Sequence, residues 1–165
     1  MQTIATPITG KECLVTNQSA LYVLTGFYSA FNSRDLAAMG RNWAQTDDVV
    51  MDNPIGGIRR GWTAIHEGYE RIFTGPAEVY VEFYDYSLHE AGDIFYAVGR
   101  ERGYFRVNGK QLDLAIRTSR IFRKRDGRWQ QVHHHGSIED PALLDRYQRA
   151  VFGLAQLETS IGEEK

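Results

Sequence analysis

The hydrophobic periodicity of this chain changes near residue 77, and that change constrains the fold more than any other feature. Before it, apolar residues such as Leu21 and Leu24 recur at helical spacing. After it, apolar and polar residues alternate, beginning in the segment 78–90. The pair Asn108-Gly109 then indicates a tight hairpin turn. The sequence therefore predicts an α+β domain, with helices packed on one face of an antiparallel sheet.

The predicted elements follow from this periodicity and from the residues that start and stop it. Asp35 and Thr63 are expected N-caps, and Asp140-Pro141 is an expected cap followed by proline at the first helical position. The predicted helices are 17–32, 35–44, 63–74 and 141–157, and the predicted strands lie near 48–53, 78–90, 94–107, 112–124 and 128–137. We divide the chain into an N-terminal arm (1–16), one domain (17–138), and a C-terminal helix with an acidic tail (139–165).

Composition excludes several classes of protein. The chain has 165 residues, a length that suits one domain with its own core. A net charge of −2 argues against a dedicated nucleic-acid binder. The single cysteine, Cys13, cannot form an intramolecular disulfide. No apolar run approaches the roughly 20 residues of a membrane span, and the first residues lack the pattern of a secretory signal. We therefore expect a soluble cytoplasmic protein.

Several segments resemble the nuclear transport factor 2-like superfamily, which includes ketosteroid isomerases, SnoaL-like polyketide cyclases and the association domain of calcium/calmodulin-dependent protein kinase II. FYSAFNSRDLAAM, WAQTDDVVMDNPIGG and RRGWTAIHEGY resemble its helix–helix–strand–helix opening. RTSRIFRKRDGRWQQVHHHGS resembles its closing hairpin, most closely that of the kinase association domain. The resemblance implies a cone-shaped α+β domain, in which a curved antiparallel sheet wraps around three N-terminal helices, with an extra C-terminal helix. The superfamily uses its pocket for unrelated functions, so the resemblance alone gives no activity.

The stretch MDNPIGG is similar to the isomerase segment whose catalytic base is an aspartate directly before proline. Asn53 stands at that position, with Asp52 one place earlier. Asparagine has no carboxylate to accept a proton from a carbon acid. The second isomerase carboxyl falls near Ala115 or Ile116, both apolar, whereas Tyr28 lies close to the oxyanion-hole tyrosine. Steroid isomerisation is therefore not expected.

Two arginines, Arg100 and Arg120, align with arginines that point into the pocket of the kinase association domain, while Gly136 replaces the third. If Arg100 faces the pocket, strand alternation places the following residues on the same face: Tyr96, Val98, Arg102, Tyr104, Leu114, Ile116 and Thr118. That predicted face carries no Asp or Glu. We therefore expect Arg100 and Arg120 to bind the carboxylate of a small, otherwise apolar ligand. The alternative is a pair of structural salt bridges, for example with Glu82 or Asp52.

The run His133-His134-His135 suggests a metal site, but the geometry of a strand argues against one. His133 and His135 share one face and His134 points to the other, so the three cannot chelate one ion. We expect no metal and no other cofactor. His134 is expected to face the pocket and is the candidate general acid/base, because the intrinsic pKa of histidine is close to neutral. Tyr28 and Asp52 complete the candidate catalytic set.

The candidate ligand-binding residues each have a plainer alternative. The predicted set is Asn53, Trp43, Tyr69, Arg100, Arg120, Tyr96, Tyr104, Ile116 and Thr118. Asp52 and Asn53 precede a proline, so they can equally be turn formers. Trp43, Tyr28 and Tyr69 at helical spacing can equally be core packing.

Two function classes stay open at this point. One is a SnoaL-like enzyme of the isomerase, cyclase or dehydratase type, acting on a small, largely apolar, carboxylate-bearing ligand. The other is a non-catalytic ligand-binding and oligomerisation module. The expected partners are a small molecule and a second copy of the chain, and neither nucleic acid nor membrane. The resemblance implies a homodimer formed through the outer sheet face, and the expected apolar residues on that face are Phe95, Ala97, Phe105, Ile121 and Trp129.

Overall fold

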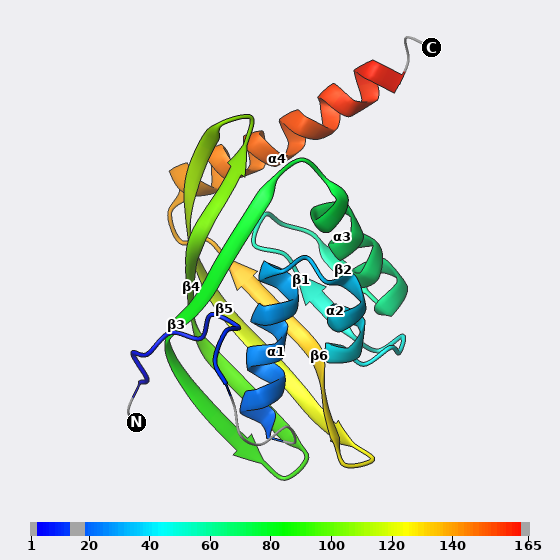
Figure 1. The fold of residues 1–165 in the computed structure, drawn as a ribbon, viewed down its shortest axis with the longest axis vertical. Helices are drawn as coiled ribbons and strands as arrows, with labels where there is room; N and C mark the ends of the chain where they lie inside the picture. Colours follow the sequence, from blue (N-terminus) through cyan, green and yellow to red (C-terminus); the bar gives the residue numbers. More distant parts are fainter. Residues whose placement is uncertain (1–2, 14–18, 163–165) are drawn as a thin grey trace.

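A computed structural model describes residues 3–13 and 19–162, with side chains as far as Gly153. Over these residues it has four helices and a six-stranded sheet, which confirms the predicted α+β class (Figure 1). The elements are α1 (Ala20–Asn32), α2 (Leu36–Asn42), β1 (Val50–Asp52), β2 (Ile58–Arg60), α3 (Trp62–Thr74), β3 (Glu78–Ala91), β4 (Ile94–Val107), β5 (Lys110–Arg125), β6 (Arg128–Ser137) and α4 (Pro141–Gly162).

The strands follow the order β2-β1-β6-β5-β4-β3, and every neighbouring pair is antiparallel except β1 and β6, which run parallel. Figure 1 shows α1, α2 and α3 on one side of this sheet, and the far end of α4 extending beyond the rest of the fold. The interior therefore lies between the sheet and the first three helices, as the resemblance implied.

Helix boundaries follow local capping chemistry. The Asp35 carboxylate accepts the backbone N–H of Ala38 at 2.8 Å, so the predicted cap of α2 is confirmed. The predicted cap of α3 at Thr63 is wrong. Gly61 precedes that helix with a φ of 77°, a conformation that favours glycine, and α3 begins at Trp62.

Part of the predicted N-terminal arm packs on the domain. The backbone amides of Ile4 and Ile8 donate to the carbonyls of Tyr86 and Phe83 at 2.7 and 2.8 Å, so this part of the chain runs along the free edge of β3. Ile8 is buried there. Residues 14–18, which include the predicted start of the first helix at 17, and residues 163–165 at the end of the predicted tail lie outside the described residues.

The strand β2 was not predicted. The residues after Gly56-Gly57 were expected to lead directly into a helix, but Ile58–Arg60 pairs with β1, with Met51 opposite Arg59. A strand of three residues is too short to show an alternation of its own. It brings Arg59 beside the interior.

Sheet curvature comes from a bulge in β3 and two glycines in β4. The β3–β4 register shifts between Tyr84 and Ser87. A Cβ at Gly99 would lie 2.6 Å from the Cβ of Tyr86, and one at Gly103 would clash with the β3 backbone. Only glycine permits this close approach, and the bend it allows wraps the sheet around the helices.

The side chains of β4 point the opposite way from the prediction. Phe95, Ala97 and Phe105 are buried in the core, whereas Tyr96 and Val98 are exposed. Core packing decides this, because the first three residues are the apolar set of the strand. The predicted apolar outer face is therefore wrong. Trp129 is also buried in the core, and Ile121 is half-buried. The homodimer stays a prediction that rests on the family resemblance.

A second bulge sets which residues of β6 face inward. The β5–β6 register shifts between Ile121 and Phe122, so that Val132 has no partner in the ladder. Strict alternation would place the side chains of Gln131 and His134 on opposite faces of the sheet, since one position is odd and the other even. Both are buried. The extra residue at the bulge lets both side chains reach the interior.

Candidate functional site

A cavity of about 550 Å³ lies between the inner face of the sheet and the helices. Its buried lining side chains include Phe27, Met51, Tyr69, Val81, Glu101, Leu114, Ile116, Arg120, His134 and Tyr147. Its exposed lining residues are Arg71, Thr74, Pro76 and Phe152. The mouth of the cavity therefore lies between the end of α3, the connection to β3, and α4.

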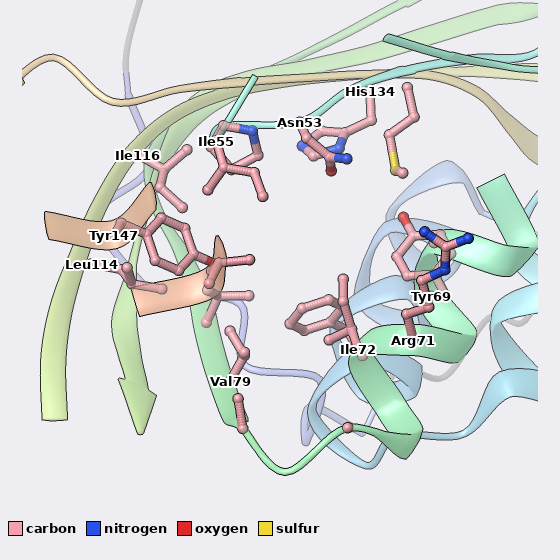
Figure 2. Close-up of a pocket in the computed structure, with 18 of the residues that line it drawn as sticks. Asn53, Ile55, Tyr69, Arg71, Ile72, Val79, Leu114, Ile116, His134 and Tyr147 are labelled. Atoms are coloured by element: carbon pink, nitrogen blue, oxygen red, sulfur yellow. The ribbon is translucent and has the colours of Figure 1, made fainter. Parts of the chain in front are cut away.

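The lining is divided between apolar and polar parts. Figure 2 shows Asn53, His134 and Tyr69 toward one end of the cavity. The apolar side chains around the other part are Ile55, Ile72, Val79, Leu114 and Ile116, with the ring of Tyr147 among them. Such a lining, mostly apolar with a few polar groups, is typical of small-molecule sites.

Arg120 forms a buried network at the cavity wall. Its Nη2 donates to Glu101 Oε1 at 2.9 Å, its Nη1 to Gln131 Oε1 at 3.3 Å, and its Nε to the Tyr28 hydroxyl at 3.3 Å. The Tyr28 hydroxyl in turn donates to Glu101 Oε1 at 2.8 Å. The guanidinium carbon also lies 3.4 Å from the centre of the Phe27 ring. Each of the three guanidinium nitrogens therefore bonds a group of the protein itself.

The electrostatics favour the charged form of this arginine. Burial opposes the cation, but the neighbouring Tyr28 and Glu101 raise the pKa of Arg120 above its usual value. Burial and the Glu101 carboxylate together raise the pKa of Tyr28 well above its usual value, so this hydroxyl stays protonated. A charged guanidinium and a neutral phenol converge on one carboxylate oxygen.

The other oxygen of that carboxylate is free. Glu101 lines the cavity and is only 4% exposed. Its Oε2 makes no hydrogen bond to any residue that the structure describes, since both hydrogen bonds go to Oε1. The cavity wall therefore presents a carboxylate that is fixed through one oxygen and open to a donor at the other.

His134 is held by a chain of hydrogen bonds that fixes its tautomer. The Thr118 hydroxyl donates its hydrogen to the carbonyl of His135 at 3.0 Å. Its oxygen must then accept from the Nε2–H of His134, 3.0 Å away. Burial, with the Arg120 cation nearby, lowers the pKa of His134 well below its usual value. The ring is therefore neutral near pH 7, and its Nδ1 is buried without a hydrogen-bond partner among the described residues.

Tyr69 lines the cavity, and Trp43 packs behind it. Their ring centres are 6.4 Å apart. Burial raises the pKa of Tyr69 to about 12 against the opposing effect of the Arg120 cation. Trp43 Nε1 and the Tyr69 hydroxyl both lack a partner with hydrogen-bond geometry in the part of the chain that the structure describes. Trp43 is fully buried and does not reach the cavity, so its placement is that of a core residue.

The segment around Asp52 and Asn53 forms a turn. The Asn53 amide donates to the Gly57 carbonyl at 3.3 Å, and the Gly56 amide donates to the Asn53 carbonyl at 2.9 Å. Asn53 also lines the cavity. Asp52 does not line it; its Oδ2 lies 3.2 Å from Nδ1 of His135, which is exposed.

Arg100 does not enter the cavity, so the expected pairing with Arg120 is wrong. Its side chain is 44% exposed and pairs with Glu139 at 2.8 Å and with Asp85 at 3.6 Å. Tyr96 and Tyr104, predicted beside it, also lie on the outer face; Tyr96 stacks on a histidine of β3, and Tyr104 donates to a β3 glutamate. The reversed orientation of β4 accounts for all three.

The expected carboxylate site at Arg120 is also wrong. The predicted inner face had no acidic residue, but the structure places Glu101 on it, in an ion pair with Arg120. Ile116 does line the cavity, as expected, and Thr118 lies behind His134. Tyr28 is buried in the wall behind the cavity lining, where it contacts Glu101.

Comparison with known proteins agrees with this architecture. The model of the SnoaL-like domain family matches residues 21–141, most of the chain. The chain belongs to the SnoaL-like domain family. Like that family, it lies within the nuclear transport factor 2-like superfamily.

Individual relatives of this SnoaL-like domain are distant. It is 26% identical to the F-box protein SKIP8 of Arabidopsis thaliana over 152 residues, which covers 88% of this chain and 60% of that protein. The chain thus spans less than two thirds of that relative. A structure from Thiobacillus denitrificans, named for the calcium/calmodulin-dependent protein kinase type II association domain, has a TM-score of 0.60 at 22% identity, covering 74% of this chain and 96% of its own.

A second structure, a member of the same superfamily from Streptomyces avermitilis that is provisionally named a dehydratase, has a TM-score of 0.62 at 21% identity. It covers 70% of this chain and 89% of its own. At these identities the two structures show the fold alone.

Among the lining residues that the sequence did not indicate are Glu101, Arg59, Arg71 and Tyr147. Glu101 had a usable signal, because it stands in the same alternating set as Phe95, Ala97 and Phe105. A carboxylate at a position that alternation predicts to be buried is almost always paired with another polar or charged group. Arg59 and Arg71 had no such signal, since their place depends on the packing of β2 against α3.

Among the described residues, no group of three or more His, Cys, Asp or Glu side chains is placed to bind a metal ion. Within the same residues, no helix combines the length and apolarity needed to cross a bilayer.

Proposed function

We propose that this SnoaL-like domain binds a small, largely apolar molecule in its cavity, and that Glu101 accepts a hydrogen bond from a hydroxyl or N–H group of that molecule. One observation carries the proposal: a buried carboxylate lines a mostly apolar cavity with one oxygen occupied and the other without a partner. No described protein group donates to this second oxygen, so a ligand that brings a donor can form a charge-assisted hydrogen bond with it inside a mostly apolar cavity.

Charge balance supports an uncharged group at this end of the ligand. Arg120 and Glu101 carry opposite charges at 2.9 Å and neutralise each other. A ligand carboxylate would have to compete with Glu101 for the arginine, and its own charge would face the glutamate. A neutral donor meets neither obstacle.

Binding can be tested with two aromatic probes of nearly equal shape, 2-naphthol and 2-methoxynaphthalene, by fluorescence titration at pH 7.5. The hydroxyl of 2-naphthol can donate to Glu101, whereas the methyl ether cannot. We expect 2-naphthol to bind about tenfold more tightly or better, on the scale of a charge-assisted hydrogen bond. Failure of both probes to bind at millimolar concentration would contradict the proposal.

Two variants locate the interaction. Glu101→Gln should bring the two affinities within about twofold of each other, because an amide is a weaker acceptor than a carboxylate. Retained binding of 2-methoxynaphthalene shows that the variant still has its cavity. Glu82→Gln is the matched control, since Glu82 lies on the outer face in an ion pair with Arg102. An unchanged preference for 2-naphthol in Glu101→Gln would overturn the role of Glu101.

A second candidate function is proton-transfer catalysis, and the same free oxygen of Glu101 favours it. A general base must reach the proton that it removes, and Arg120 and Tyr28 fix this carboxylate from behind. His134, neutral and beside the cavity, is the second candidate acid/base. Asp52 has no place in this proposal, because its carboxylate is directed at His135.

The catalytic proposal can be tested with 2-tetralone, a small apolar ketone with acidic α-protons. Nuclear magnetic resonance follows the exchange of these protons for deuterium in D₂O. We expect acceleration by the protein, lost in Glu101→Gln and kept in Glu82→Gln. Binding of 2-naphthol without any acceleration of this exchange would favour the non-catalytic binding module.

The mass of the protein by light scattering tests the predicted homodimer, and a monomer at micromolar concentration would contradict it.

A further inference from the structure

Two arginines of the cavity lining, Arg59 and Arg71, form no ion pair with any acidic residue that the structure describes. We propose that these two side chains bind an anionic group of the ligand, distinct from the group that meets Glu101. This inference rests on the proposed function and adds the chemical class of the ligand: an apolar body that carries a neutral donor and, separately, an anionic group.

The side chain of Arg59 is held in place by α3. Arg59 lies opposite Met51 in the short β1–β2 ladder, and Met51 itself lines the cavity. Its Nη1 donates to the carbonyl of Ala64 at 3.2 Å. A Cβ at Gly68 would lie 2.9 Å from Arg59 Nε, so the arginine rests against the helix where glycine leaves space. Because the side chain is already ordered, binding an anion costs it little conformational entropy.

Arg71 lies on the same stretch of α3. It follows Gly68 by three residues, which places the two positions one turn apart on neighbouring parts of the helix surface. Arg71 is exposed and lines the cavity, and Figure 2 shows it near Tyr69 on the α3 side. The glutamates closest to it along the helix, Glu67 and Glu70, make no ion pair with it.

The charges of the lining do not balance. The charged lining residues are Arg59, Arg71, Arg120 and Glu101. Since Arg120 and Glu101 pair with each other, two positive charges of the lining are left without a partner. A guanidinium presents parallel N–H donors that suit the two oxygens of a carboxylate or a phosphate. On the outer face, by contrast, Glu139 bonds Arg100 and pairs with Arg117.

A matched pair of probes separates the anion from the rest of the ligand. The acid is 3-(6-hydroxynaphthalen-2-yl)propanoate, which extends 2-naphthol by a short carboxylate arm, and its control is the corresponding primary amide. Calorimetric titration at low salt should show the acid binding about five- to tenfold more tightly than the amide, as expected for a partly screened charge-assisted contact. Raising the salt concentration should reduce that preference.

Three variants test which arginines act. Arg59→Gln and Arg71→Gln should each weaken the acid about threefold or more and leave the amide nearly unchanged. Arg71 is exposed, so its replacement should leave the fold intact. Arg60→Gln is the control, because Arg60 neighbours Arg59 in β2 but does not line the cavity. It should keep the preference of the unmodified protein for the acid.

The outcomes distinguish this inference from the proposal on which it rests. If 2-naphthol binds but the acid is no tighter than the amide, the anion site is refuted and the proposed function stands. If the acid binds more tightly than the amide but Arg59→Gln and Arg71→Gln do not reduce this preference, the anion binds elsewhere and the inference is also refuted. If 2-naphthol fails to bind at all, both fail together.

Discussion

The two faces of the sheet carry ion pairs of nearly the same length in very different surroundings. On the inner face, Arg120 and Glu101 are 2.9 Å apart, with side chains 2% and 5% exposed. On the outer face, Arg100 and Glu139 are 2.8 Å apart, with side chains 44% and 49% exposed. The distance alone does not distinguish them. Burial does, because water and salt can replace the outer partners but not the inner ones.

The largest expected effect comes from breaking the inner pair. Arg120→Met removes the cation and leaves the Glu101 carboxylate buried without its charged partner. We expect the free energy of unfolding to fall by about 3–5 kcal/mol, the usual cost of breaking a buried pair from one side. Arg100→Met should change it little, since Asp85 and Glu139 stay in water. Urea unfolding followed by circular dichroism measures both.

A double variant sharpens this comparison. Arg120→Met combined with Glu101→Leu removes both charges, and it should be clearly more stable than Arg120→Met alone. If the double variant is as unstable as the single one, the cost lies in lost packing against Phe27 and not in an unpaired charge. Equal losses for Arg120→Met and Arg100→Met would contradict the distinction between the faces.

Much of the fold could be predicted because long elements repeat their pattern many times. The four long strands and the helices appear within a few residues of their predicted bounds, apart from the end of α4, which reaches Gly162. The short strand Ile58–Arg60 could not, since its pairing depends on β1. The two faces of β4 are the reverse of the prediction, because the resemblance of Arg100 to a pocket arginine points Phe95 and Ala97 outward, whereas burial of these apolar side chains decides the face.

The candidate site was less predictable than the fold, and β6 shows why. His134 was expected to face the pocket, and it does line the cavity. Simple alternation also points Gln131 away from His134, yet both are buried because of the bulge at Val132. A bulge changes the face of every residue after it, and a single sequence gives little sign of where it occurs.

A smaller effect should follow from removing one hydrogen bond of the inner network. Tyr28→Phe deletes the hydroxyl that donates to Glu101 at 2.8 Å and accepts from Arg120 at 3.3 Å. The ring and its stacking on Phe83 are kept. We expect a loss of about 1.5–3 kcal/mol, as for hydrogen bonds to charged groups. Tyr104→Phe is the outer-face control, because its hydroxyl also donates to a glutamate but in water.

Denaturant midpoints of the two tyrosine variants test this prediction directly. If Tyr104→Phe lowers the free energy of unfolding as much as Tyr28→Phe does, the hydrogen bond on the inner face contributes no more to stability than its exposed counterpart.

The smallest expected effect is a dependence of the free energy of unfolding on pH, caused by the burial of His134 on the inner face. Burial lowers the pKa of His134 well below 6.5, its ordinary value. As the pH falls below 6.5, the unfolded chain takes up a proton at this position and the folded protein does not. The free energy of unfolding should therefore be fully retained above pH 6.5 and decline below it, by up to about 1.4 kcal/mol per pH unit from this group.

The variant His134→Gln removes this contribution and keeps a donor for Thr118. Its free energy of unfolding should fall less steeply between pH 6.5 and pH 5 than that of the unmodified protein. Some slope will stay, because burial also lowers the pKa of His133. His66→Gln, on α3 and outside the cavity lining, should keep the full slope. Urea unfolding at several pH values gives each slope, and identical slopes for His134→Gln and the unmodified protein would show that His134 is not held neutral by the inner face.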